Sequence, residues 1–482
     1  MDPFESVVDL AAAVRRRELS PVEVVDTYLE RIDRHDSVNA FVWRNDEEVR
    51  TAAKAAEQAV VEGGELGPCH GVPIPIKELT HVDGQPATYG SLGISDAPRT
   101  GNAPVVDRLL NAGFLLMGRT NSPEMGLLTT TENERFGTTH NPWRLTHSPG
   151  GSSGGAAAAV AAGLAPVAHA SDGGGSIRVP SSCCGLVGLK PSRGRVPQPV
   201  AAWEHATVEG AITRYVRDAA LLLDVMSVPD PLVWYQAPAP LRPFLDEVGA
   251  AQERLRIGLL TAAPTGMPVD PHCVEAAEKT GRLLESLGHD VFPAEPEFFT
   301  EEAWIGYAQT VLDASLCAMP FDEPELAGPQ LRYRMERAKN RDSGAYVRAS
   351  VRLQEESRGV VAQWGRDFDV LLTPTLACLP PLVDTVLREA VDNPGGLRLT
   401  ETQMISFTSF CNITGLPAIS LPVHTSPDGL PIGAQLVAGP WDEAVLIRLA
   451  SALEPLVEWT TRRATHAGPA TSSMTSRPRC SM

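Results

Sequence analysis

Hydrophobic and polar positions follow a helical period through the first 62 residues of the chain. Residues 20–23 (Ser-Pro-Val-Glu) have the pattern of a capping box, in which a serine hydroxyl and a glutamate cap the free amides at the start of a helix. A second amphipathic stretch runs from about residue 46 to residue 61 and stops at a pair of glycines. The pattern predicts that residues 1–62 form a helical segment packed on the core.

Between residues 63 and 228 the pattern changes to short apolar runs separated by glycine-rich turns. Residues 114–117 and 165–168 indicate buried strands, and residues 156–163 indicate a helix of small side chains. Strands that alternate with helices are typical of a layered α/β core. We therefore expect residues 63–228 to form the main part of such a core.

The rest of the chain divides into three parts. Residues 229–345 contain a proline-rich link, one strand-like run at 257–260 and several helical stretches, which predict a variable helical region added to the core. Residues 461–482 are rich in Ser, Thr, Arg and Pro, which predicts a disordered tail. Between them, residues 346–460 predict a second part of the core, with strands at 370–372, 418–421 and 432–437 and a closing helix at about 443–456.

The composition of the 482 residues, with 43% hydrophobic and 21% charged, is that of a globular protein. The net charge of -18 disfavours a nucleic-acid partner, because phosphate binding needs clustered Lys and Arg. No run of about 18 uncharged apolar residues occurs, and the acidic N-terminus does not read as a targeting peptide. We therefore expect no membrane association.

The eight cysteines are scattered, with no CxxC pair and no Cys/His cluster of zinc spacing. The eleven histidines likewise fall in no recognisable constellation. This usage predicts a protein of the reducing cytoplasm, without a metal or another cofactor.

Two segments dense in glycine and serine stand out at residues 150–155 (GGSSGG) and 172–178 (DGGGSIR). Such runs are usually flexible linkers, but these two lie inside the best-patterned part of the core. Glycines in a tight turn can aim main-chain N–H groups at the oxyanion that acyl transfer creates. The loop of Gly173, Gly174, Gly175 and Ser176 therefore predicts an oxyanion hole and a nucleophile together.

Several segments resemble, in order, the signature of the amidase signature family. The similarity extends over about residues 5–460 and is weakest between about 229 and 400. The matching segments are 71–78 (GVPIPIKE), 118–124, 141–143, 150–155, 172–180, 184–191, 212–214 with Asp218, and 415–420.

This resemblance implies an α/β/α sandwich with a central mixed β-sheet, whose catalytic core is residues 63–228. It implies that Ser176 is the nucleophile, that Ser152 is a bridging serine preceded by a cis peptide bond, and that Lys77 is the general base. The expected activity is hydrolysis of amide, anilide or carbamate bonds in a small molecule, with an esterase side activity. The region from 141 to 196 is also similar to the bacterial subgroup of cyclic-amide (nylon oligomer) hydrolases, and a homodimer is common among relatives.

The chemistry of a lysine base sets a condition on its surroundings. A lysine with the ordinary pKa near 10.4 is neutral in only about one molecule in 2,500 at pH 7. Burial among hydroxyl groups, away from carboxylates, lowers that pKa. Ser152 would then relay the proton between Lys77 and Ser176, and activity would favour the alkaline side of neutrality.

Neighbouring residues are assigned supporting roles. We expect Ser153, Asp172 and Arg178 to stabilise the two loops, and Glu78 to point to the opposite face of the strand from Lys77. Lys190 is expected at the surface. The variable region, at about residues 304–319, is expected to line the acyl pocket.

Three other interpretations remain open. Ser152 and Ser153 each satisfy the Gly-x-Ser-x-Gly pattern of Ser-His-Asp α/β-hydrolases, but the polar segment before them does not read as a strand. The glutaminase subunit of tRNA-dependent amidotransferases looks similar, yet Ile405 stands where that subgroup has a glutamine-binding aspartate. A non-catalytic binding module is disfavoured because Lys77, Ser152 and Ser176 are all present.

Overall fold

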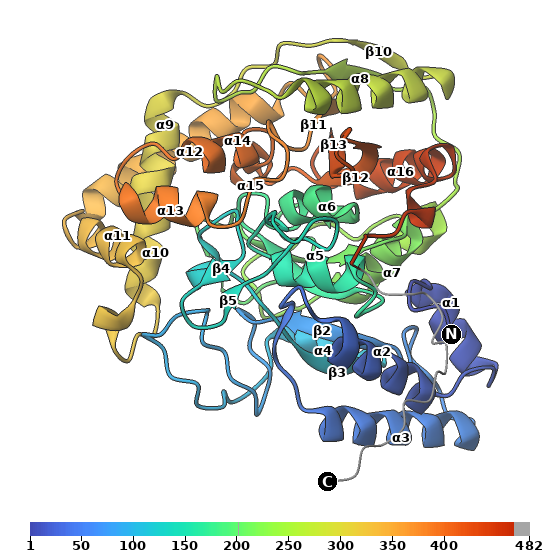
Figure 1. The fold of residues 1–482 in the computed structure, drawn as a ribbon. Helices are drawn as coiled ribbons and strands as arrows, with labels where there is room; N and C mark the ends of the chain where they lie inside the picture. The colour runs from blue at the N-terminus through green and yellow to red at the C-terminus, as the bar shows by residue number, and fades with distance from the viewer. Residues whose placement is uncertain (201, 467–482) are drawn as a thin grey trace.

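The computed structural model describes residues 1–200 and 202–466 of the chain. The N-terminal part forms one end of the molecule, drawn in blue in Figure 1. It holds the helices α1 (Val7–Arg15), α2 (Pro21–His35), α3 (Asp46–Glu62) and α4 (Pro104–Asn111), with a small sheet of β1 (Phe41–Trp43), β2 (Pro73–Lys77) and β3 (Leu115–Thr120).

The predicted helix boundaries at this end are confirmed. The hydroxyl of Ser20 accepts a hydrogen bond from the Val22 amide at 3.0 Å, and α2 begins at Pro21. Helix α3 ends against Gly63, whose positive φ of 75° suits a residue without a side chain. The small sheet in the same segment was not predicted from the first 62 residues, because β1 is only three residues long.

A mixed sheet of eight strands forms the centre of the described residues, in the order β10-β9-β11-β13-β12-β7-β8-β6. Strands β9, β10 and β11 run parallel, and the remaining neighbours pair antiparallel. The strands are β6 (Ala168–Asp172), β7 (Val187–Lys190), β8 (Val208–Thr213), β9 (Arg256–Leu259), β10 (Asp290–Pro293), β11 (Val370–Pro374), β12 (Ala418–Thr425) and β13 (Pro431–Ala438). A short hairpin of β4 (Glu132–Asn133) and β5 (Gly137–Thr138) lies apart from it.

Both faces of this sheet are covered, as the sandwich prediction requires. Side chains of a strand alternate between faces, and the adjacent Leu371 and Leu372 accordingly belong to different hydrophobic clusters. Leu372 packs in the cluster that contains α7 (Val216–Met226), α8 (Pro271–Ser286) and α16 (Glu443–Val457). Leu371 packs in another cluster with Phe407 and Phe410.

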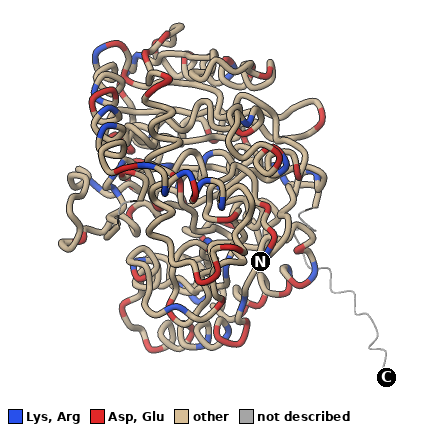
Figure 2. The backbone as a smooth tube through the Cα atoms, turned by 90° about the vertical axis from the view of Figure 1, so that its left-hand side faces the viewer, with Lys and Arg blue, Asp and Glu red and all other residues tan. Residues whose placement is uncertain are grey.

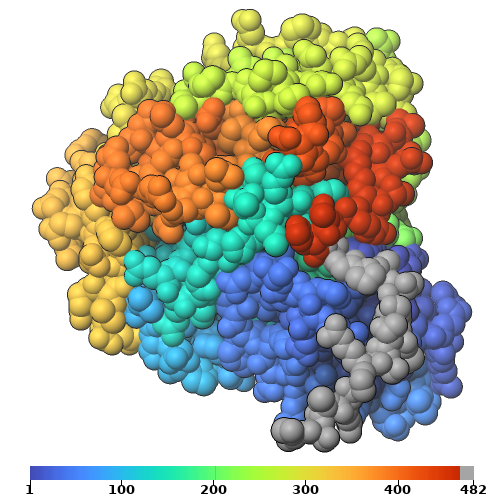
Figure 3. Space-filling view, in the orientation of Figure 1, coloured from blue at the N-terminus to red at the C-terminus, as the bar shows by residue number. Residues whose placement is uncertain are grey.

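The remaining helices are α5 (Gly154–Ala161), α6 (Arg178–Cys184), α9 (Glu301–Gly306), α10 (Leu312–Ser315), α11 (Pro329–Lys339), α12 (Ser343–Val361), α13 (Thr385–Asp392), α14 (Leu399–Ile405) and α15 (Ser409–Thr414). In the space-filling view, residues near 150 lie between the N-terminal part and the C-terminal part of the chain (Figure 3). Residues 150–155 are all buried, and residues 172–178 are buried except for Gly174 and Ser176, which are partly exposed.

Several boundaries differ from the sequence prediction. The strand expected at 165–168 is β6 and begins only at Ala168, because residues 162–167 connect α5 to the sheet. The region 229–345 contributes β9 and β10 to the central sheet in addition to its helices. Of the predicted tail, Thr461 ends a 3-10 turn and Ala464 is buried beside Phe4, whereas residues 467–482 lie outside the described residues.

No helix in the described ranges is long and apolar enough to cross a membrane. Acidic and basic positions are intermixed along the backbone in Figure 2.

Helix α5 comes unusually close to the end of β3. A Cβ atom added to Gly155 would lie 2.5 Å from the main-chain nitrogen of Asn121 and 2.6 Å from its carbonyl oxygen. Glycine is therefore required at this position to bring the helix that follows Ser152 against the small sheet that carries Lys77.

We predict that Gly155→Ala lowers the free energy of unfolding by about 2 kcal/mol, since a clash with backbone outweighs the gain of about 1 kcal/mol that alanine usually brings to a helix. Gly64→Ala is the matched control, because nothing lies within 4 Å of a Cβ there. It should change stability by less than about 0.5 kcal/mol. Urea denaturation of both variants tests this, and equal stability would contradict the close approach.

Candidate active site

Lys77 is the last residue of β2, and its side chain is fully buried. Its Nζ donates hydrogen bonds to Ser152 Oγ at 2.7 Å and to Ser171 Oγ at 3.1 Å, and a longer one of 3.4 Å to the Ser171 carbonyl. Within the described part of the chain, no carboxylate lies at salt-bridge distance from this amine. Lys77 therefore sits among hydroxyl and carbonyl oxygens, as its predicted role requires.

Burial lowers the pKa of Lys77 to about 7, against the opposing effect of the negative charges of Glu209 and Asp172. A pKa of about 7 leaves roughly half of the molecules with a neutral amine at pH 7. The neutral form is the one that accepts a proton, so this environment makes Lys77 a usable base near neutrality.

Ser152 follows a cis peptide bond, Gly151–Ser152, as predicted. The neighbouring Ser153 links the two glycine-rich segments: its amide donates to the Ser176 carbonyl at 3.3 Å, and its hydroxyl donates to the Ser171 carbonyl at 3.2 Å. These contacts agree with the supporting role expected of Ser153. They bring the loop of Ser152 against the loop of Ser176.

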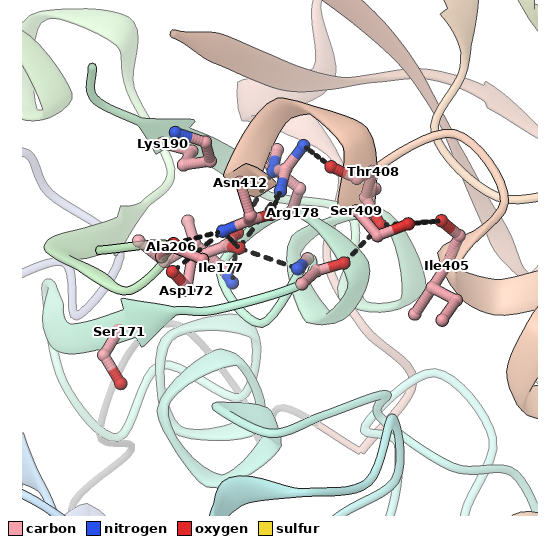
Figure 4. Close-up of polar contacts among 12 residues, drawn as sticks. Ser171, Asp172, Ile177, Arg178, Lys190, Ala206, Ile405, Thr408, Ser409 and Asn412 are labelled. Atoms are coloured by element: carbon pink, nitrogen blue, oxygen red, sulfur yellow. Dashed lines mark hydrogen bonds and ion pairs between the residues drawn. The ribbon is translucent and has the colours of Figure 1, made fainter. Parts of the chain in front are cut away.

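The loop of Ser176 is organised around the buried carboxylate of Asp172 (Figure 4). Its oxygens accept hydrogen bonds from the main-chain amides of Gly175 at 2.7 Å and Ile177 at 3.0 Å. Arg178 donates to both of them through Nε and Nη2, each at 3.0 Å. The Asn412 side chain, from α15, donates to the same carboxylate at 2.9 Å.

Burial alone would raise the pKa of Asp172, but the Arg178 guanidinium overcomes this effect and holds that pKa well below its usual range. The pair therefore remains ionised inside the protein. Thr408 adds a further contact, since its hydroxyl donates to the Gly174 carbonyl at 2.7 Å. Asp172 and Arg178 thus shape the loop, in agreement with the structural role expected of them.

The predicted oxyanion hole needs one correction. The Gly175 amide already donates to Asp172, so it is not free to bind an oxyanion. Gly173, Gly174 and Ser176 have amides that donate to no acceptor among the residues described. A Cβ on Gly174 would meet no atom within 4 Å, so there is open space beside this part of the loop.

Trp203 covers the other side of this loop and was missed by the sequence analysis. A Cβ on Gly173 would overlap the Trp203 ring, so only glycine allows the indole to lie against the loop here. The ring also packs against two apolar clusters that include Leu316 and Tyr307. Residues 203–205 all have positive φ, and their sequence has no helical or strand period that would have predicted this placement.

Lys190 was expected at the surface, and that prediction is wrong. It ends β7 in the interior, 1% exposed, and its Nζ donates to the Pro191 carbonyl at 2.8 Å. Burial, together with the positive charge of Arg178, lowers the pKa of Lys190 to about 7. By contrast, Glu78 points away from Lys77 as predicted, and its carboxylate accepts from the amides of Thr88 and Gly90.

His169 is a second residue that the sequence analysis did not single out. It lies on β6, fully buried, and its Nδ1 is 3.4 Å from the Lys77 amide nitrogen. Its Nε2 is 3.0 Å from Glu209 Oε2. The imidazole therefore lies between the main chain of Lys77 and the carboxylate of Glu209, whose negative charge acts to raise the Lys77 pKa.

Comparison with known proteins gives consistent results. The family model described as Amidase matches residues 23–447. The chain is 35% identical over 486 residues to a 6-aminohexanoate-cyclic-dimer hydrolase of Paenarthrobacter ureafaciens, covering 96% of this chain and 97% of that protein. A solved structure of 6-aminohexanoate cyclic dimer hydrolase superposes with a TM-score of 0.89 at 34% identity, over 97% of this chain and 99% of the other. A bacterial aryl acylamidase superposes with a TM-score of 0.87 at 26% identity, over 97% and 99% of the two chains.

The fold and these similarities define a hydrolase of carbon–nitrogen bonds other than peptide bonds. The chain belongs to the amidase signature family, and its similarity to cyclic-dimer hydrolases agrees with the predicted subgroup.

We predict that Lys190→Met flattens the dependence of stability on pH. Because the pKa of Lys190 is about 7 in the folded chain and near 10.4 when unfolded, the unfolded state binds more protons between these values. The free energy of unfolding therefore rises with pH, by at most about 1.4 kcal/mol per pH unit from this residue. Urea denaturation at pH 7, 8 and 9 should show a smaller rise for Lys190→Met. The exposed Lys54→Met is the control and should keep the slope of the unmodified protein.

Proposed function

We propose that this amidase forms an acyl-enzyme on Ser176, with Lys77 as the general base and Ser152 as the proton relay. The observation that carries the proposal is the buried Lys77 amine, which is hydrogen-bonded to Ser152 Oγ at 2.7 Å and has a pKa of about 7. The contact between Ser153 and Ser176 supports it further, because it joins the two loops that supply the serines.

In the first half-reaction, neutral Lys77 takes the proton of Ser152 as Ser152 takes the proton of Ser176, and Ser176 Oγ attacks the substrate carbonyl. The amides of Gly173, Gly174 and Ser176 are free to bind the oxyanion that forms, and one such donor contributes about 3 kcal/mol in other hydrolases. The relay then returns the proton to the departing nitrogen. In the second half-reaction Ser152 and Lys77 take a proton from water, which attacks the acyl carbonyl, and the proton returns to Ser176 Oγ as its bond to the acyl group breaks and the acid leaves.

The proposed substrate is a small uncharged amide, either cyclic or an anilide. The names of two similar proteins, a cyclic-dimer hydrolase and an aryl acylamidase, support this range. The same relay would protonate the leaving atom of a carbamate or an ester, so we propose those as side activities. Trp203, which touches both the Gly173 loop and the cluster of Tyr307, supports the proposal that residues 304–319 line the acyl pocket.

The alternative classes have less support. No strand immediately precedes Ser152 in the described chain, because residues 139–153 consist of turns and isolated bridges, whereas a nucleophile elbow needs one. A glutaminase subunit needs a carboxylate to bind its glutamine, and the position aligned with it is Ile405, next to Thr408 and Ser409 in Figure 4.

Three further expectations remain predictions. A homodimer and the absence of a nucleic-acid partner rest on the sequence alone. A cytoplasmic location agrees with the state of the seven cysteines in the described residues, which are all free thiols.

We expect kcat/KM for an anilide to rise with pH along a curve with an apparent pKa of about 7. The sign follows because Lys77 must be neutral to accept a proton, so activity is lost as pH falls below that pKa. A pH–rate profile measures this. A curve without an ionisation between pH 6 and 8 would argue against Lys77 as the base.

Substitutions should separate the roles of the serines. Ser176→Ala, Ser152→Ala and Lys77→Met should each reduce kcat on anilides, cyclic amides and primary amides by at least about 10³-fold. The loss in Lys77→Met should be smaller for p-nitrophenyl esters, whose leaving group needs no proton. Ser153→Ala is the matched control and should keep most of the activity, because Ser153 supports the loops through one carbonyl contact of its hydroxyl.

Two outcomes would redirect the assignment. Full activity in Ser176→Ala with loss in Ser153→Ala would indicate a nucleophile elbow. Glutamine hydrolysis without anilide hydrolysis would indicate the amidotransferase subunit.

A further inference from the structure

Two histidines and a glutamate converge where α8 begins against β12. His272 and Glu275 lie in the first turns of α8, and His424 lies near the end of β12. His272 Nδ1 is 3.7 Å from Glu275 Oε2, and His424 Nε2 is 3.5 Å from the same oxygen. Among the described residues, this is a group whose three ligand atoms all lie within 4.8 Å of one another.

The two spacings that involve Glu275 fit a tetrahedral metal ion. Zinc binds imidazole nitrogen and carboxylate oxygen at about 2.0–2.1 Å, so ligand atoms around a tetrahedral zinc are about 3.4 Å apart. The two pairs that involve Glu275 are within a few tenths of an ångström of this value. From this geometry we infer that His272, Glu275 and His424 bind a divalent transition metal of the zinc class, with water in the fourth position.

The local structure holds the ligands in place. The carboxylate of Asp270 accepts from the His272 amide at 2.8 Å and fixes the first turn of α8, and His424 is paired with Ile432 in the sheet. The His424 side chain is 17% exposed, whereas those of His272 and Glu275 are 38% and 54% exposed. One ligand is therefore fixed in the sheet, and the other two can adjust to a metal from the solvent side.

The positive charges of two nearby side chains disfavour the binding of a metal cation at this site. Lys279 and Arg462 are near enough to His424 to affect it electrostatically. A bound cation must overcome their repulsion through direct coordination, with one negative charge from Glu275. The same three side chains can also form ion pairs without a metal when the histidines are protonated, and a metal titration distinguishes the two states.

The role of the site would be structural. Helix α8 connects β9 to β10 at one edge of the central sheet, and β12 lies near the middle of that sheet. A metal would therefore tie the crossover helix to the central strands. None of the three ligands belongs to the proposed catalytic set, so this inference does not depend on the proposed mechanism.

Zn²⁺ titration of the full-length chain, after treatment with a chelator, tests the site by calorimetry. Co²⁺ titration adds a second reading, because tetrahedral Co²⁺ with nitrogen ligands has strong visible absorption. We expect one equivalent of metal to bind and to raise Tm, since a ligand that binds only the folded state stabilises it. His424→Ala and His272→Ala should each weaken Zn²⁺ binding by at least about 10-fold, because loss of groups that only support ligands already costs that much elsewhere.

His35→Ala, which removes a histidine from the end of α2, is the matched control and should bind Zn²⁺ like the unmodified chain. His272→Ala removes a half-exposed side chain and should fold even if His424→Ala does not. Anilide hydrolysis should be unchanged in His272→Ala, which separates this test from that of the catalytic residues. The inference is overturned if no metal binds, or if His272→Ala and His424→Ala bind Zn²⁺ as tightly as the unmodified chain, as they would if the exposed Cys317 thiol were the ligand.

Discussion

The removal of one lysine amine from water is the physical constraint on which the proposed chemistry depends. In water Lys77 would be protonated and unable to accept a proton, and burial changes this by making the charged form costly. The neighbours of the amine are the hydroxyls of Ser152 and Ser171, which satisfy hydrogen bonds without restoring the charge. A carboxylate at the same distance would form an ion pair and raise the pKa again. The packing around β2 therefore determines the basicity of the amine.

A second requirement is that the loop of Ser176 keep its shape next to this apolar interior. Asp172 and Arg178 are both fully buried, and each would be costly alone, but their mutual hydrogen bonds and those of Asn412 compensate the loss of water. The same carboxylate binds the Gly175 amide, which leaves the neighbouring amides pointing elsewhere. Lys190 lies near this pair, and burial together with the positive charge of Arg178 lowers its pKa.

The sequence predicted those features that are determined locally. The serine that caps α2 immediately precedes the helix, and the glycine-rich loops need backbone conformations that their own glycines provide. The errors concern groups whose surroundings come from distant parts of the chain. Lys190 is the last residue of a short strand, and nothing in that strand reveals that β8 and β12 enclose it. The run of three glycines suggested that the Gly175 amide binds the oxyanion, but in the fold this amide donates to Asp172. Trp203 packs against the loop of Ser176 from a segment whose sequence has no helical or strand period, so its position could not be predicted.

The position of Trp203 indicates that the chemical step and the choice of substrate depend on different parts of the fold. Lys77 ends a strand of the core, and Ser152 and Ser176 lie in the loops that lead into α5 and α6, whereas Trp203 belongs to an irregular segment held from outside. Its neighbour Glu204 is hydrogen-bonded to Tyr346 of α12, and His205 is hydrogen-bonded to Tyr235 in the half-exposed loop after α7. Residues in these outer elements can change without altering the burial of Lys77. Differences in substrate among relatives with this core are therefore expected to arise where the chain contacts Trp203, because there a change of shape leaves the pKa of Lys77 and the loop of Ser176 intact.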